Sequence, residues 1–261
     1  MNELLFAFGL TLFAGLATGV GAFLALVTRR TDAKFLAVSL GFSAGVMIYV
    51  SLVEIFVKAQ VALVAELGER AGAWATAGGF FGGIALIAVI DRLVPSRVNP
   101  HEYPHDDDGR QRRLMRMGTM TAAAIAIHNF PEGFATFVAA MQQPSVAIPV
   151  VVAIALHNIP EGISVAVPIH SATGDRRKAF RYSFLSGLAE PLGGVLGYLV
   201  LLPFMSDTVF GVVFAGVAGI MVFISLDKLL PTAQEYGEHH LSVYGLVAGM
   251  AVMAVSLLLF V

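Results

Sequence analysis

Eight long apolar stretches, separated by little polar sequence, dominate this chain. They cover residues 4–27, 35–57, 72–94, 114–141, 145–170, 180–203, 206–230 and 242–261. A helix of about 20 apolar residues crosses the ~30 Å hydrocarbon core of a bilayer, and the alternating pattern of membrane strands is absent. Charged residues make up 13% of the 261 residues, whereas a soluble domain carries about 25%. We therefore expect an all-α, polytopic membrane protein, embedded in the lipid bilayer as a single transmembrane domain over residues 1–261.

Charge and cysteine content exclude several other classes of protein. The formal net charge is −2, so no basic surface for nucleic acid is expected. The chain has no cysteine, which excludes disulfides, thiolate metal sites, iron–sulfur clusters and a cysteine nucleophile.

The distribution of lysine and arginine predicts the orientation. Fourteen of the sixteen lie in or beside the loops after the odd-numbered spans, and only Lys58 and Arg70 lie on the opposite side. Positively charged loops stay in the cytoplasm. Both termini are therefore expected on the outer side, and the polar segment 95–113 is expected to be a cytoplasmic loop containing His and Asp residues.

Two internal repeats link spans that run in opposite directions. Residues 124–133 (AIAIHNFPEG) match 153–162 (AIALHNIPEG) at eight of ten positions. Residues 44–52 (AGVMIYVSL) match 218–226 (AGIMVFISL) at five of nine positions. Inverted repeats around a site at the bilayer midplane are a common construction of secondary transporters.

The first repeat places the same polar residues in the middle of two apolar spans. In each copy His and Glu are four residues apart and share a helix face. The proline between them frees a backbone carbonyl, and the following glycine permits close approach of another helix. A further carboxylate, Glu190, lies in the middle of the sixth span. The candidate ligands are His128, Asn129, Glu132, His157, Asn158, Glu161 and Glu190.

Imidazole, carboxylate and amide oxygen together suit a borderline or hard divalent metal. Three carboxylates brought together repel one another, and one or two divalent cations would remove that repulsion. Bridging by Glu132 and Glu161 would make a binuclear centre. The alternative is a buried hydrogen-bond network that only locks the helices together.

Other polar residues are candidates for the path to and from this centre. They are Glu54, Asp91, Asp227, His101 and His105. The alternatives are interfacial carboxylates or ion pairs, with Arg92 beside Asp91 and Lys228 beside Asp227, and an ordinary solvated loop for the two histidines.

The doubled HNxPEG motif, the eight spans, the outer termini and the His-containing third loop resemble the ZIP (Zrt-, Irt-like protein) family of metal transporters, most closely its bacterial ZupT branch. The resemblance implies a three-two-three helix arrangement, import of divalent metals across the bacterial cytoplasmic membrane, a sliding motion of one helix block and homodimers. It implies one site at His128, Glu132 and Glu161. An adjacent site would use Asn129, Glu132, His157, Asn158, Glu161 and Glu190.

We therefore expect a divalent metal importer and not an enzyme. No permanent cofactor is expected, and Zn2+, Fe2+, Mn2+ or Co2+ would be the transported substrate. The alternative is a membrane-embedded metal-dependent hydrolase, which needs three fixed ligands, an open position and a separate base. The HExxH motif of many zinc hydrolases is absent. A proton pathway that uses the same carboxylates without metal is a third hypothesis.

Overall fold

The computed structural model describes residues 2–27, 33–93, 107–142, 144–201, 206–235 and 239–258. These residues are almost entirely helical, and no strand occurs among them. The helices are α1 (Asn2–Val27), α2 (Ala33–Val50), α3 (Phe56–Leu67), α4 (Glu69–Leu93), α5 (Asp107–Gln142), α6 (Pro144–Thr173), α7 (Arg176–Gly187), α8 (Ala189–Leu201), α9 (Asp207–Ile224), α10 (Leu230–Glu235) and α11 (His239–Leu258). Two π-helical turns, η1 (Ser51–Ile55) and η4 (Ser225–Leu229), join α2 to α3 and α9 to α10.

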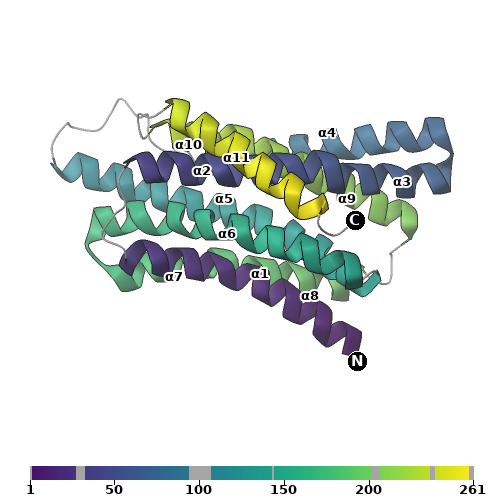
Figure 1. Ribbon diagram of the computed structural model, residues 1–261, viewed down its shortest axis with the longest axis horizontal. Helices are drawn as coiled ribbons and strands as arrows, with labels where there is room; N and C mark the ends of the chain where they lie inside the picture. The colour runs from purple at the N-terminus through teal and green to yellow at the C-terminus, as the bar shows by residue number, and fades with distance from the viewer. Residues whose placement is uncertain are drawn as a thin grey trace.

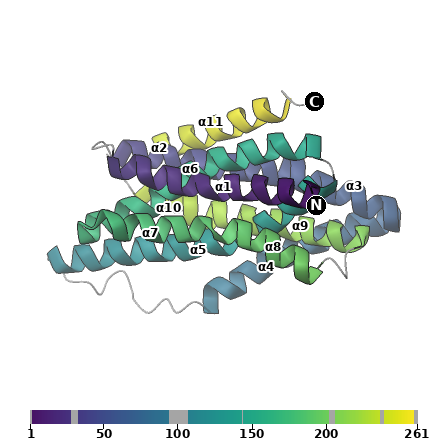
Figure 2. The ribbon, with the colours of Figure 1, turned by 90° about the horizontal axis from the view of Figure 1, so that it is seen from below.

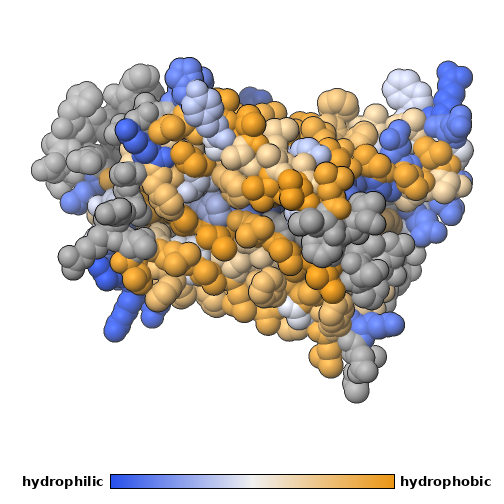
Figure 3. Space-filling view, viewed as in Figure 1, coloured by the Kyte–Doolittle hydropathy of each residue, from blue (hydrophilic) through white to orange (hydrophobic). Residues whose placement is uncertain are grey.

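These elements form the eight expected spans. In the described residues, seven continuous helices are long and apolar enough to cross a membrane. The eighth span is α5, which carries the first HNxPEG motif and whose first half contains several charged residues. Apolar side chains cover most of the surface in view, and hydrophilic residues gather at the two ends of the molecule (Figure 3). The chain is therefore a multi-pass membrane protein, as expected.

Two boundaries differ from the expectation. The second span does not end near residue 57, because η1 passes directly into α3 and the helix continues to Leu67. Gly68 then ends it with a φ of 81°, a conformation that favours glycine. Helix α5 begins at Asp107, so the last seven residues of the expected loop 95–113 are helical. The rest of that segment, residues 95–106, lies outside the described residues.

The helices pack as two blocks (Figure 1). One block contains α1, α5, α6, α7 and α8, and its apolar core includes Ala22, Ile125, Val165 and Ala179. The other contains α2, α3, α4, α9, α10 and α11, with a core that includes Met47, Phe214 and Met253. Within the first block α1 lies along α6, and α5 lies along α8 (Figure 2). Helices α5 and α6 face the second block through α9 and α2.

The second internal repeat is visible as matching backbone irregularities. Both π-helical turns begin at the repeated serine, Ser51 in one copy and Ser225 in the other. Each hydroxyl donates to the carbonyl of the methionine four residues earlier, at 2.6 Å to Met47 and 2.7 Å to Met221. Single π-turns inside α-helices are rare and occur often at functional sites. Their appearance at equivalent positions supports the inverted-repeat interpretation.

Candidate metal centre

Each HNxPEG motif ends in a glycine that packs against a neighbouring helix of the first block. A Cβ at Gly133 would lie 1.8 Å from the carbonyl oxygen of Glu190, and a Cβ at Gly162 would lie 1.9 Å from that of Thr18. Only glycine permits helix backbones to approach this closely. The motif glycines therefore seat α5 against α8 and α6 against α1, which brings the polar residues of α5 and α6 to one level.

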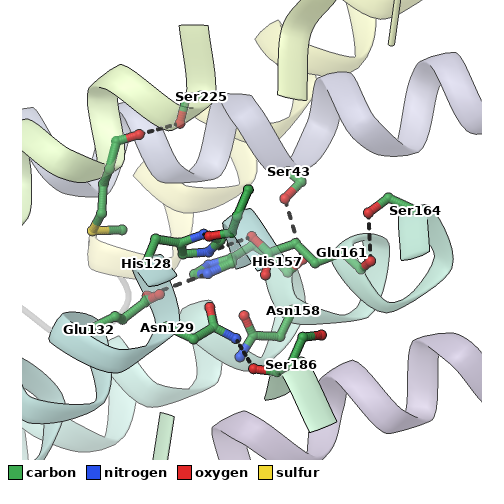
Figure 4. A network of polar contacts seen from close by, with 12 residues as sticks. Ser43, His128, Asn129, Glu132, His157, Asn158, Glu161, Ser164, Ser186 and Ser225 are labelled. Atoms are coloured by element: carbon green, nitrogen blue, oxygen red, sulfur yellow. Dashed lines mark hydrogen bonds and ion pairs between the residues drawn. The ribbon is translucent and has the colours of Figure 1, made fainter. Parts of the chain in front are cut away.

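The histidines pair with the glutamates across the two helices (Figure 4). His128 Nε2 lies 3.1 Å from Glu161 Oε1, and His157 Nε2 lies 3.4 Å from Glu132 Oε1. His128 Nδ1 lies 3.2 Å from the Ala124 carbonyl oxygen. When Nδ1 donates to that carbonyl, Nε2 points at the carboxylate and is available to share a proton or to bind a cation.

The asparagines face the opposite side of the pair, toward α1, α7 and α8. Asn129 Nδ2 donates to the Ser186 carbonyl at 3.5 Å. Asn158 Nδ2 donates to the Ala14 carbonyl at 2.9 Å and to Glu190 Oε2 at 2.7 Å. Glu190 thus joins the motif residues through Asn158, at the beginning of α8.

All seven candidate ligands are buried, and each has at most 1% of its surface exposed. Several of their oxygen atoms have no hydrogen-bond partner: Asn129 Oδ1, Glu132 Oε2, Asn158 Oδ1, Glu161 Oε2 and Glu190 Oε1. An unpartnered buried oxygen costs free energy, and an unpaired buried carboxylate costs more. Oxygen atoms of this kind, beside imidazole nitrogens, are the ligand set that a divalent cation prefers.

Comparison with known proteins agrees with this geometry. The family model of the ZIP zinc transporter matches residues 92–257. The chain is 60% identical over 264 residues to the zinc transporter ZupT of Streptococcus mutans, covering all of both chains. It is 62% identical over 267 residues to the ZupT of Lysinibacillus sphaericus, covering 100% of this chain and 99% of the relative. The chain belongs to the ZIP family.

The ZIP resemblance seen in the sequence is therefore confirmed. The ligand set itself stays a prediction. Among the described residues of this ZIP chain, no three His, Cys, Asp or Glu side chains converge as a metal-binding group.

Two of the candidate path residues form ion pairs with lysines, and the side chains of the other three lie outside the described residues. Glu54 Oε1 pairs with Lys58 Nζ at 2.5 Å, one turn further along the helix. Asp227 Oδ2 lies 3.0 Å from Lys228 Nζ, the ion pair considered as the alternative for this residue. The side chain of Asp91 in α4, and both His101 and His105, lie outside the description.

Sequence reasoning missed two residues beside the site. Ser43 on α2 lies with its hydroxyl 3.4 Å from the His157 carbonyl oxygen, and so connects the second block to the motif. Thr18 on α1 contributes the carbonyl that Gly162 approaches. A signal for Thr18 exists in the sequence: residues 15–21 (GLATGVG) match 187–193 (GLAEPLG) at both glycines and at the Leu-Ala pair.

Proposed function

We propose that this ZIP protein is a divalent metal transporter whose cargo is zinc. The observation that carries the proposal is the pair of buried His–Glu contacts across α5 and α6, with unpartnered carboxylate and amide oxygens around them. The relatives named above are zinc transporters by name, and each is similar to this chain over its whole length. Nothing in the site favours the hydrolase hypothesis.

The proposed ligands have distinct roles. His128 and His157 supply borderline nitrogen ligands, and His128 is held in position by the Ala124 carbonyl. Glu132 and Glu161 come from opposite helices and face the histidines, so they can bridge two ions. Asn129, Asn158 and Glu190 supply oxygen ligands on the side of α1 and α8. Because these ligands also suit iron(II), manganese and cobalt, we include those ions as competing cargo.

Direction and motion follow from the same proposal. The lysine and arginine distribution favours outer termini, and uptake into the cytoplasm across the bacterial cytoplasmic membrane. The site lies in the first block close to its boundary with the second, where Ser43 reaches the His157 carbonyl. A sliding motion of the first block past the second would carry bound metal from one side to the other.

The test is uptake of zinc into liposomes that contain the purified protein, with iron(II), manganese and cobalt as competitors. His128→Ala should abolish saturable uptake, because it removes one nitrogen ligand and one His–Glu contact. His239→Ala is the matched control, since His239 is exposed at the start of α11, away from the motif. Tight zinc binding without any uptake would reject transport and return the hydrolase hypothesis to consideration.

A further inference from the structure

A third inverted repeat pairs α1 with α7 and α8, and it gives Glu190 a counterpart. A Cβ at Gly193 would lie 1.9 Å from the Phe130 carbonyl, and a Cβ at Gly21 would lie 1.9 Å from the Ile159 carbonyl. Phe130 and Ile159 occupy the same position in the two HNxPEG motifs. Together with the contacts of Gly133 and Gly162 described above, this correspondence places Thr18 in α1 where Glu190 lies in α8.

The asparagine contacts follow the same correspondence. Asn129 donates to the carbonyl of Ser186, four residues before Glu190. Asn158 donates to the carbonyl of Ala14, four residues before Thr18. The two halves of the site are thus alike in backbone and in the asparagine bonds to these carbonyls. They differ at one pair of equivalent positions, which holds a carboxylate in α8 and a hydroxyl in α1.

The hydroxyl of Thr18 lacks the partner that other buried threonines of this chain have. Thr11 and Thr76 each donate to the carbonyl four residues earlier, at 2.8 Å. For Thr18 that carbonyl belongs to Ala14, and Asn158 already donates to it. Thr18 is fully buried, and its Oγ1 has no hydrogen-bond partner.

A second unpartnered oxygen belongs to Asn129, which, like Thr18, lies near the end of α7. Thr18 Oγ1 would lie 2.9 Å from a Cβ at Gly187, and Asn129 reaches the neighbouring Ser186 carbonyl. Asn129 Oδ1 also has no partner, although the residue is fully buried. The two residues with these unpartnered neutral oxygens, Thr18 and Asn129, therefore lie against neighbouring residues of α7, Gly187 and Ser186.

We propose that Thr18 is a further binding residue for the transported cation. Its hydroxyl oxygen and the side-chain oxygen of Asn129 receive the divalent ion, or one water that the ion retains, beside α7. This inference rests on the proposed transport function and adds to it a residue outside the HNxPEG motifs. Because a neutral oxygen pair binds a divalent ion more weakly than a carboxylate does, these two oxygens are suited to passing the ion on rather than holding it.

The test uses the purified full-length protein and zinc alone. Thr18→Val keeps the shape and removes the hydroxyl, whereas Thr18→Ser keeps the hydroxyl. Calorimetry should give a zinc Kd that is raised roughly tenfold by Thr18→Val and nearly unchanged by Thr18→Ser, and uptake in liposomes should show the same rise in KM. The melting temperature without zinc should not fall in Thr18→Val, because its hydroxyl has no protein partner to lose.

Thr11→Val is the matched control on the same helix. It removes a hydroxyl that is bonded to Ala7, so it should lower the melting temperature and leave the zinc Kd unchanged. A native Kd in Thr18→Val would overturn the proposal. If that variant fails to fold, Thr18→Ala and Thr18→Ser replace it, and equal Kd values for those two would overturn the proposal equally. A native protein that neither binds nor transports zinc would overturn the proposed function as well.

Discussion

The two copies of the HNxPEG motif are nearly equivalent within themselves and differ in the helices that flank them. His128 contacts Glu161 at 3.1 Å, and His157 contacts Glu132 at 3.4 Å, so each copy gives its imidazole to the carboxylate of the other. Outside the motifs the equivalence ends. The backbone of the copy on α5 lies against that of Glu190 in α8, whereas the backbone of the copy on α6 lies against that of Thr18 in α1. The carboxylate of Glu190 accepts a hydrogen bond from Asn158 of the α6 copy.

This difference separates two requirements of the site. Symmetric positions carry the glycines and asparagines that fix the backbones, because α5 and α6 must each be held against a neighbouring helix of the block. The asymmetric position carries the charge. A carboxylate on one side only makes the two halves unequal for a cation, although the frame that presents them is the same.

The strongest test of equivalence removes one carboxylate from each motif. Glu132→Gln and Glu161→Gln should each lower zinc uptake by more than about 100-fold, because each removes a ligand that both helices share and that no neighbour replaces. Initial uptake rates in liposomes give the measurement. Glu66→Gln is the control, since Glu66 is exposed on α3. Full uptake by either motif variant would show that the copies are not equivalent and would reject bridging by these glutamates.

The second test concerns the matched glycines. Gly133→Ala and Gly162→Ala each place a Cβ within 2 Å of a backbone carbonyl, at 1.8 Å and 1.9 Å, and neither helix can yield without moving its partner. Each should lower the free energy of unfolding by about 1–3 kcal/mol or more, measured by thermal unfolding in detergent. Gly78→Ala meets nothing within 4 Å and should be neutral or slightly stabilising. If only one of these two substitutions left the stability unchanged, the helix contact in that copy of the motif would be looser than in the other.

Much of this arrangement could be predicted from the sequence. The eight spans follow from runs of apolar residues, because a bilayer leaves few other folds open to such a chain. The HNxPEG residues stand out because ionisable groups in the middle of a span are costly and rarely occur without a function. All seven residues are buried in the structure, including Glu190, which lies outside both motifs, and their role as metal ligands stays a prediction.

The remainder depends on contacts between distant parts of the chain. The extension of the second span to Leu67 follows from a π-turn at Ser51, and no residue pattern distinguishes that turn from regular helix. The role of Thr18 depends on which side chain takes the carbonyl of Ala14, and that partner is 144 residues away in the chain. Short matches such as that of residues 15–21 with 187–193 become meaningful only when the equivalent glycine contacts are seen.

The third test compares the two asparagines. Asn158 makes two hydrogen bonds, at 2.9 Å and 2.7 Å, and one acceptor is the carboxylate of Glu190, whereas Asn129 makes a single bond at 3.5 Å. Asn158→Ala should therefore lower the free energy of unfolding by about 1–2 kcal/mol, and Asn129→Ala by about 0.5 kcal/mol. Thermal unfolding with a chelator present, so that no metal contributes, gives the comparison. Equal losses would mean that the bond to Glu190 adds no stability.

The smallest effect on stability is expected from substitutions at the helix ends of the third repeat. When Thr18 is aligned with Glu190, Asp175, in the loop before α7, takes the position equivalent to Glu3 in the first turn of α1. Asp175 accepts from the backbone N–H of Arg177 at 2.8 Å and of Lys178 at 3.1 Å, and so caps α7.

These contacts decide the pH dependence of the cap. The backbone N–H of Lys178 above all, and that of Arg177, lower the pKa of the Asp175 carboxyl from its ordinary value of 3.8. A carboxylate with a lowered pKa stabilises the fold above its ordinary value and loses that contribution as the pH falls through the lowered one. Asp175→Ala should thus lower the melting temperature by roughly 1–2 °C at pH 7 and progressively less below pH 3.8. Glu3→Ala, at the equivalent position of the other copy, should lower the melting temperature less, because no backbone N–H is seen to bond the Glu3 carboxylate. A larger decrease for Glu3→Ala would show that α1 depends on its first turn more than α7 does.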